Sequence, residues 1–295
     1  KPLIVYTPFL ENGNTPETLV TDQQIEDGPK ASYYYGEVTT RFAVQESLNS
    51  PAWKLYSELT PEVGLQYLKN MHFMQIKNAD YVLATALGGF TKGASALEMA
   101  AAYATLEYDG LYRTPTCIKK IMDAENEVVI YESNQEGTVV YKETAARMMT
   151  NVLVSVMEEG TGKDAKLEGM PCAGKTGTTN EYKDGWFVGY SRYYTTSVWV
   201  GCDMPKSVEG LKGASYPSAI WKDYMTYAHE GLTPLSFLPY AQLSEEFMEE
   251  YYPSESESTS EDGENVQDGE GTLEDGENVP DGEDILTAGD GQAEI

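Results

Sequence analysis

The sequence predicts an α+β domain, in which helices pack with an antiparallel sheet, followed by an acidic segment of different composition. Over much of the first 160 residues, apolar side chains recur every three or four positions, a spacing typical of amphipathic helices. Residues 173–202 instead contain short runs rich in Thr, Val and aromatic residues, separated by turn-forming residues, as in antiparallel strands. Helices followed by such a compact sheet indicate the α+β class.

Capping residues mark the ends of the predicted elements. Thr60 precedes Pro61, a proline at the first position of a helix, and Ser95 with Glu98 forms a capping box. Gly160 is the stop signal of a further helix. We therefore expect helices at about residues 61–71, 96–110, 144–159 and 218–229. We expect strands at residues 173–178, 186–190 and 195–202.

Composition divides the chain into a globular part, residues 1–240, and a tail, residues 241–295. Of the 48 acidic residues, 19 lie from Glu245 onward, in a segment with no Lys or Arg. The sequence Glu-Asp-Gly-Glu-Asn-Val occurs twice there, without the spaced oxygen ligands of an EF-hand calcium loop. So much charge with few apolar residues buries too little surface to offset the chain entropy. We predict a disordered acidic low-complexity tail, with weak binding of cations or a partner as the alternative.

Composition also excludes several classes of function. A net charge of −28 leaves no basic excess to neutralise phosphates, so we expect no nucleic-acid partner. No run approaches the 18 apolar residues of a transmembrane helix. Three cysteines without CxxC spacing and two histidines are too few for a metal cluster or a Ser-His-Asp triad. We expect no metal or organic cofactor, and any nucleophile here needs a base other than histidine.

The sharpest motif is Lys175-Thr176-Gly177-Thr178, at the end of a predicted strand. A lysine beside hydroxyl groups suits the binding of a carboxylate. A glycine leaves the strand edge open to a ligand that lies antiparallel to it. For this motif on its own, the alternative is an ordinary exposed strand with Gly177 at a bulge.

Two weaker features precede this motif. Ser47 and Asn49 lie two positions apart, after a helical stretch and before Pro51. On their own they are equally typical of a cap between two helices. Lys1 heads an apolar stretch that runs to Leu10 and predicts a first helix.

In their order along the chain, the three features resemble the Ser-x-x-Lys, Ser-x-Asn and Lys-Thr-Gly motifs of the penicillin-binding proteins. Lys1 is similar to the lysine that ends the first motif. The resemblance is strongest for the bifunctional class A members and covers about residues 1–235. It implies a fold like that of the serine β-lactamases and transpeptidases, whose first strands and nucleophilic serine would precede Lys1. Further similar segments are residues 41–52, 87–104, 160–162 and 184–190.

The resemblance implies catalytic roles for three residues. A serine three positions before Lys1 would attack the carbonyl of a D-Ala-D-Ala stem peptide or of a β-lactam. Lys1, one helical turn along, would take the proton of that serine. Ser47 would pass the proton to the leaving group. The charge of Lys175 would depress the pKa of Lys1, as a lysine needs in order to act as a base.

The resemblance also implies how the substrate would be bound. Asn49 would bind the substrate amide. Lys175, Thr176 and Thr178 would hold the terminal carboxylate at the strand edge that Gly177 leaves open. The backbone N–H of Thr178 would form an oxyanion hole with the N–H of the nucleophilic serine.

The function implied is that of a peptidoglycan D,D-transpeptidase that cross-links stem peptides through an acyl-enzyme, with β-lactams as inhibitors. The parent protein would lie outside the cytoplasmic membrane, held by an upstream transmembrane anchor beside a glycosyltransferase domain. The chain itself, which begins after the serine, would be unable to acylate. The alternatives are a D,D-carboxypeptidase, a serine β-lactamase, for which we identify no deacylating glutamate, and a non-catalytic stem-peptide-binding domain.

Overall fold

The computed structural model describes residues 1–240 of the chain, apart from residues 126 and 134. The predicted acidic tail, residues 241–295, lies outside the described residues and stays a prediction. In the part that is described, no helix is both long enough and apolar enough to cross a membrane.

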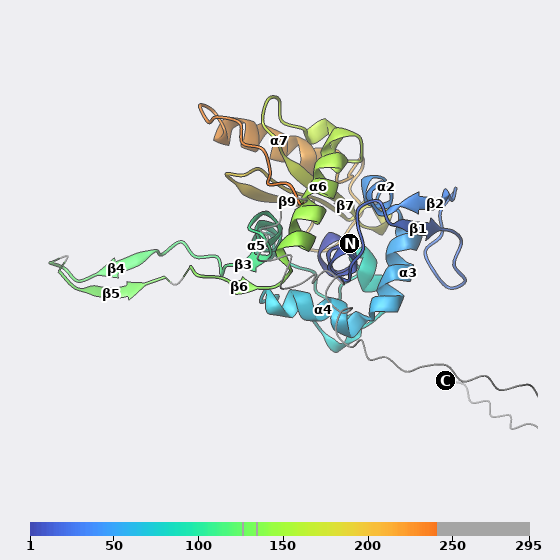
Figure 1. The fold of residues 1–295 in the computed structure, drawn as a ribbon, viewed down its shortest axis with the longest axis horizontal. Coiled ribbons are helices and arrows are strands. Elements are labelled where there is room, and N and C mark those ends of the chain that lie inside the picture. The colour runs from blue at the N-terminus through green and yellow to red at the C-terminus, as the bar shows by residue number, and fades with distance from the viewer. Residues whose placement is uncertain (126, 134, 241–295) are drawn as a thin grey trace, which may run out of the picture. The chain divides into compact units, whose positions relative to one another are not determined.

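The described residues form helices and antiparallel strands, as the sequence predicts (Figure 1). The helices are α1 (Thr7–Glu11), α2 (Thr40–Gln45), α3 (Asn49–Leu59), α4 (Pro61–Asn70), α5 (Ala96–Glu107), α6 (Glu143–Glu158) and α7 (Tyr216–Ala228). A π-helical turn, Pro2–Tyr6, precedes α1, and four 3-10 turns lie at Asn78–Asp80, Leu83–Leu87, Lys163–Ala165 and Asn180–Tyr182. The strands are β1 (Leu19–Asp22), β2 (Gly36–Thr39), β3 (Leu111–Tyr112), β4 (Lys120–Met122), β5 (Val129–Glu132), β6 (Thr138–Val139), β7 (Ala173–Thr178), β8 (Asp184–Tyr190) and β9 (Thr195–Gly201).

The predicted meander is the three-stranded antiparallel sheet β7-β8-β9. Alternate side chains of β8 enter two different cores. Phe187 packs against Trp221 of α7, with 5.0 Å between ring centroids. Tyr190 meets Tyr103 of α5 and hydrogen-bonds Thr150 of α6 at 2.8 Å. Helices therefore cover both faces of the sheet, and among the described residues β7 pairs only with β8, which leaves its other edge open.

The apolar helix predicted at the start of the chain lies in the core. Residues 2–8 are all buried, and Tyr6 and Leu10 have no exposed surface. Its first turn is π-helical, because the carbonyl of Lys1 accepts from both Val5 N, at 3.1 Å, and Tyr6 N, at 3.2 Å. The hydroxyl of Tyr141 donates to Leu3 O at 2.6 Å. These contacts fix the helix, and with it the position of Lys1.

Several predicted boundaries need correction. The capping box of Ser95 and Glu98 forms, but α5 ends at Glu107 rather than residue 110, because Asp109 adopts a φ of 52°. Thr60 precedes α4 without capping it through its side chain, because its φ is 76°. The last helix begins two residues earlier than predicted, at Tyr216, with a proline in its first turn.

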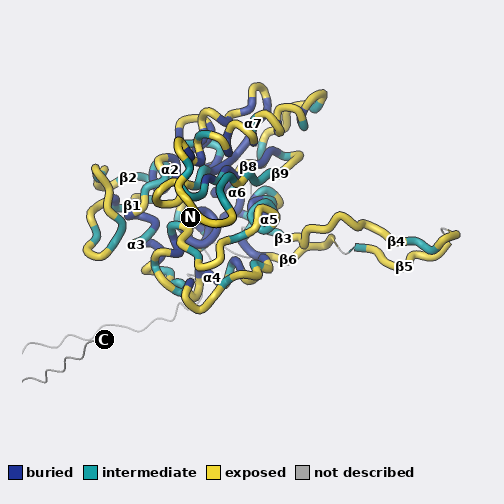
Figure 2. The backbone as a smooth tube through the Cα atoms, turned by 180° about the vertical axis from the view of Figure 1, so that it is seen from behind, coloured by how far each residue is buried: buried dark blue, intermediate teal, exposed yellow. Residues whose placement is uncertain are grey.

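Three strand pairs, β1-β2, β3-β6 and β4-β5, have no counterpart in the prediction. β1 and β2 form a hairpin, and the first residues of its connection, residues 23–27, lie beside α3. The candidate site depends on this hairpin. β4 and β5 form a ribbon whose side chains are almost all exposed (Figure 2). The ribbon was missed because it has no buried face, and period-two patterning exists only where one face of a strand is buried.

Candidate active site

The structure brings Lys1 against the Ser47-Leu48-Asn49 segment. The Lys1 Nζ lies 2.6 Å from Ser47 O, 2.6 Å from Asn49 Oδ1 and 3.3 Å from Ser47 Oγ. Leu48 O, at 3.2 Å, is a further acceptor, so oxygen atoms of this one segment surround the amine and hold its position. The first two predicted motifs therefore form one site, although 46 residues separate Lys1 from Ser47.

Ser47 lies in a strained turn between two helices. Its φ is 55°, in the left-handed region that favours glycine. The turn is closed by hydrogen bonds from Ser47 N to Val44 O, at 3.1 Å, and from Leu48 N to Ala43 O, at 2.9 Å. These bonds end α2 and allow α3 to begin at once with Asn49. The turn thus directs the Ser47 carbonyl and the Asn49 side chain at the same lysine.

A buried pair, which the sequence analysis missed, anchors the first turn of α3. Ser50 Oγ donates to Asp22 Oδ1 at 2.6 Å, and both residues are almost fully buried. The other carboxylate oxygen of Asp22 accepts from Tyr35 N at 3.0 Å. Gln23 N donates to Ser50 Oγ at 3.0 Å. The β1–β2 hairpin is thereby tied to the residue that follows Asn49, although nothing in the sequence pairs Asp22 with Ser50.

Lys175 is buried and Lys1 is partly buried, and the loss of water around both amines disfavours their charged forms. Burial, and to a smaller extent the charge of Lys175, lowers the pKa of Lys1 well below its ordinary value. Burial lowers the pKa of Lys175 to about 8, and the charge of Glu46 opposes this shift. Lys1 therefore loses its proton more readily than an ordinary lysine, whereas Lys175, with a pKa of about 8, still carries most of its positive charge at neutral pH.

The third motif lies on β7, the open edge of the sheet. Lys175 is only 5% exposed, and its Nζ donates to Thr176 O at 3.2 Å. Gly177 lies opposite Trp186 of β8 and is partly exposed. Thr178 is exposed. A lysine, two hydroxyls and an unobstructed backbone thus lie along one strand edge, the arrangement that suits a carboxylate.

The segment 160–162, one of the similar segments in the sequence, connects the second motif with the third. Thr161 N donates to Gln45 O, at the end of α2, at 3.1 Å. The Thr161 hydroxyl lies 2.9 Å from that of Thr176. A Cβ at Gly160 would lie 2.7 Å from Gln45 O, so only glycine permits this approach. The hydroxyl of Thr176 already has a partner, and it can make one more bond to a ligand.

Gly213, which the sequence analysis did not identify, orients the hydroxyl of Thr178. The Gly213 N–H donates to Thr178 Oγ1 at 2.9 Å. A Cβ at Gly213 would lie 2.6 Å from the carbonyl oxygens of both Gly177 and Trp186, so the contact requires glycine. Since the Thr178 oxygen accepts from Gly213, its own O–H is free to donate to a ligand. The signal available in the sequence was a glycine just before the last helix.

Among the described residues, no group of three or more His, Cys, Asp or Glu side chains could hold a metal ion. The arrangement places an amine of lowered pKa near a hydroxyl and beside a cationic strand edge, groups that suit proton transfer and the binding of an anion. The position three residues before Lys1, where the nucleophile is expected, precedes the sequence. The catalytic and binding roles of Lys1, Ser47, Asn49, Lys175, Thr176, Gly177 and Thr178 stay predictions.

The strain at Ser47 can be measured by comparing two variants that remove the same hydroxyl. We expect Ser47→Gly to unfold with a free energy about 1 kcal/mol higher than Ser47→Ala, because glycine adopts a positive φ at little steric cost. Urea denaturation of both variants gives the difference. Equal unfolding midpoints and slopes would show that the turn stores no strain.

Comparison with known proteins agrees with this geometry. The family model described as "Penicillin binding protein transpeptidase domain" matches residues 1–226. Penicillin-binding protein 4 of Bacillus subtilis is 35% identical over 235 residues, which cover 78% of this chain and 38% of that protein. Penicillin-binding protein 1F of the same organism is 37% identical over 243 residues, covering 78% of this chain and 33% of that protein. The chain thus spans little more than a third of the length of these relatives.

Solved structures share the fold. PonA1 from Mycobacterium tuberculosis superposes with a TM-score of 0.70 at 25% identity, covering 80% of this chain and 70% of that one. Penicillin-Binding Protein 1A from Haemophilus influenzae gives a TM-score of 0.70 at 24% identity, covering 81% and 43%. The β-lactamase and transpeptidase-like α+β fold is therefore confirmed. Because the family model matches most of its length, the chain belongs to the family of penicillin-binding protein transpeptidase domains.

Proposed function

We propose that the chain forms the site of a peptidoglycan D,D-transpeptidase, which acts through a serine three residues before Lys1. The observation that carries the proposal is the position of the Lys1 Nζ, 3.3 Å from Ser47 Oγ and 2.6 Å from Asn49 Oδ1. A lysine so placed, with a lowered pKa, can exchange protons with a serine one helical turn before it and with Ser47. The membership of the family supports the same assignment.

The first half of the reaction is acylation. The serine oxygen attacks the carbonyl of the penultimate D-Ala, and its proton passes to Lys1. The C–N bond to the terminal D-Ala breaks, and the leaving amine receives a proton through Ser47. An ester between the serine and the donor peptide results. The backbone N–H groups of the serine and of Thr178 stabilise the oxyanion that forms on the way.

The second half transfers the acyl group. A primary amine of a second stem peptide attacks the ester, an amide forms, and the serine oxygen leaves and regains a proton. Water in place of the amine gives a carboxypeptidase reaction by the same residues. The chain offers no described feature that favours water.

The strand edge at β7 is proposed to hold the terminal carboxylate of the donor peptide. Lys175 supplies the positive charge, and Thr176 and Thr178 supply hydroxyl donors, a combination that suits a planar anion. A penicillin carries a carboxylate in a comparable place and would be bound and attacked in the same way. PonA1 from Mycobacterium tuberculosis, a protein of this fold, has been solved in complex with penicillin V, a ligand of this kind.

The place of action follows from the substrate. Peptidoglycan is cross-linked outside the cytoplasmic membrane, so we propose an extracytoplasmic domain. A membrane anchor and a glycosyltransferase domain, as implied by the class A resemblance, would precede Lys1 in the whole protein. The proposed partners are stem peptides and β-lactams.

Acylation by a penicillin tests the proposal directly. The full-length protein, including the residues before Lys1, is expected to form a covalent adduct with benzylpenicillin on the serine three positions before Lys1. Lys1→Gln should slow adduct formation by at least about 100-fold, since general-base catalysis contributes that much. Mass spectrometry of the intact protein and of its peptides measures both. An exposed lysine provides the control, Lys92→Gln, which should react at the normal rate. No adduct, or an adduct on another residue, would refute the proposal.

The lowered pKa of Lys175 predicts the basic limb of the pH profile. Lysine is charged below its pKa and neutral above it, so binding of a carboxylate should weaken as the pH rises through about 8. In Lys175→Arg the loss of binding should move to a pH above the measured range, because a guanidinium stays charged. The maximal rate of this variant should nevertheless fall. The second-order rate constant for penicillin acylation between pH 6 and about 10 measures both. If the acylation rate constant of Lys175→Arg declines at the same basic pH as that of the wild type, the decline belongs to another group.

The contact between Gly213 and Thr178 predicts selectivity for a free carboxylate. Gly213→Ala should slow acylation by benzylpenicillin by about tenfold, the typical loss of one hydrogen bond to a charged group. The reaction with benzylpenicillin methyl ester, which lacks the carboxylate charge, should slow much less. Thr178→Val should have the same effect, and the double variant should be no worse than either single one. Additive losses would contradict a shared role.

A further inference from the structure

Asp22 is a buried carboxylate that the proposed reaction does not use. It lies at the end of β1 and is only 3% exposed. Both of its oxygen atoms accept hydrogen bonds, one from Ser50 Oγ at 2.6 Å and the other from Tyr35 N at 3.0 Å. A buried carboxylate is costly unless such bonds compensate for the water that it loses. The bond from Ser50 connects Asp22 with the candidate site, because Ser50 lies in the first turn of α3.

Asp22 supplies the negative charge that the start of α3 otherwise lacks. The N-cap residue, Leu48, has no side-chain oxygen, so it cannot accept from the free N–H groups of the first turn. The carboxylate of Asp22 lies at this end of the helix, one hydrogen bond away through Ser50. A negative charge there is stabilising, because the free N–H groups carry partial positive charge. The first turn of α3 therefore depends on a residue 28 positions away in the sequence.

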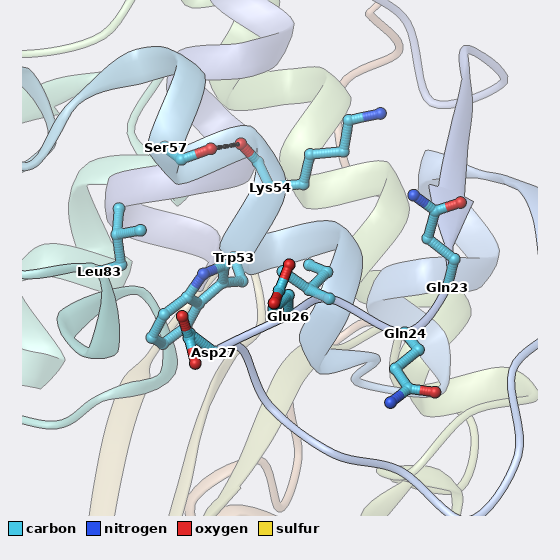
Figure 3. A pocket seen from close by; sticks show the side chains of 9 residues that line it. Gln23, Gln24, Glu26, Asp27, Trp53, Lys54, Ser57 and Leu83 are labelled. Atoms are coloured by element: carbon cyan, nitrogen blue, oxygen red, sulfur yellow. Dashed lines mark hydrogen bonds between the residues drawn. The ribbon is translucent and has the colours of Figure 1, made fainter. Parts of the chain in front are cut away.

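The surface contacts of the hairpin connection do not hold α3 in the same way. Residues 23–27 run beside α3, where they line an open hollow (Figure 3). The hydrogen bond drawn in this view, from Ser57 Oγ to Lys54 O, lies within α3. Among the described residues, the connection is hydrogen-bonded to α3 at Ser50, whose Oγ accepts from Gln23 N at 3.0 Å. The buried hydroxyl of Ser50 is thus the point at which the hairpin holds the helix.

Asp22 also faces the helix that begins at Lys1. Tyr6, five residues after Lys1, is fully buried, and its backbone N–H donates to Lys1 O at 3.2 Å. Burial, and to a smaller extent the charge of Asp22, raises the pKa of the Tyr6 hydroxyl. The carboxylate is therefore close to both helices whose first turns meet at the Lys1 amine.

Ser50 directly follows the three residues that surround this amine. Ser47 O, Leu48 O and Asn49 Oδ1 lie 2.6, 3.2 and 2.6 Å from the Lys1 Nζ. Lysine can only donate, so the oxygen of the Asn49 amide faces it, and the NH2 group is left to donate to a ligand. A shift of the first turn of α3 would displace this amide and the acceptors of Lys1 together. A displacement of about 1 Å can lower a rate by about 100-fold.

We propose that Asp22 is a positioning residue of the transpeptidase reaction, which acts through Ser50 on residues 47–49. The inference rests on the proposed function and adds to it a residue that contacts neither the substrate nor the reacting atoms. Loss of the carboxylate should slow the chemical step more than it weakens binding. The strand edge at β7, proposed to hold the carboxylate of the ligand, is fixed by other contacts, those of Thr161 and Gly213.

The test measures acylation of the full-length protein by benzylpenicillin over a range of concentrations. Asp22→Asn keeps the shape of the side chain, but its NH2 group faces one of the two donors. We expect the maximal rate constant to fall at least about tenfold, with the half-saturating concentration within about twofold of that of the wild type. Ser50→Ala, which removes only the connecting hydroxyl, should be slowed similarly. The double variant should be no slower than the slower single one.

Asp80→Asn is the matched control. Asp80 is also buried, at 1% exposed, and it accepts from the Thr91 hydroxyl at 2.6 Å and from Lys77 N at 2.7 Å. This variant should lose stability in urea as Asp22→Asn does, and it should still react at the wild-type rate constant. Mass spectrometry distinguishes a slower reaction from a loss of folded protein, because unfolded molecules lower the amount of adduct rather than the rate constant of the folded ones.

Two results would overturn the positioning role: an Asp22→Asn protein that reacts at the wild-type rate constant, or an Asp80→Asn protein that is slowed as much. If Asp22→Asn yields no folded protein, Ser50→Ala decides by the same criteria. A wild-type protein that forms no adduct would overturn the proposed function and this inference with it. A wild type that reacts, beside variants that are not slowed, would overturn the inference alone.

Discussion

The site depends on one amine, that of Lys1, which oxygen atoms of a distant segment surround. The Nζ of Lys1 connects the helix at the centre of the core with the turn between α2 and α3, through contacts of 2.6 Å to Ser47 O and Asn49 Oδ1. Burying an amine away from water is costly unless hydrogen-bond acceptors surround it. Here the acceptors come from a segment far away in sequence, so Lys1 has this environment only in the folded state. The second buried lysine, Lys175, adds to the lowering of the pKa of Lys1.

The turn that carries Ser47 is held from two sides. Asp22 and Ser50 fix the start of α3 from the β1–β2 hairpin, and Thr161 fixes the end of α2 from the segment before β7. Left-handed backbone at a non-glycine residue persists only where its surroundings over-determine it. These contacts supply that constraint. Glycine would adopt this φ more easily than serine. A serine at this position is therefore consistent with a role for its side chain.

The strand edge at β7 is held by contacts from two other segments. The Gly213 N–H donates to the Thr178 hydroxyl at 2.9 Å, and the Thr161 hydroxyl lies 2.9 Å from that of Thr176. Lys175, only 5% exposed, lies in the same strand. A carboxylate bound at this edge would therefore meet hydroxyl groups whose orientation the fold has already fixed.

The sequence alone determined the α+β class, the three-stranded meander and the order of the three motifs, because these follow from local periodicity, capping and the sequence of residues along the strand. It could not determine that Lys1 lies against Ser47, since that contact arises from the packing of a buried helix against a distant turn. Asp22 carries no signal of its own, and Asp22, Thr161 and Gly213 each matter only through a neighbour that the fold brings to them. The lowered pKa values of the two lysines were likewise a product of tertiary structure, because burial, their main cause, exists only once the chain has folded.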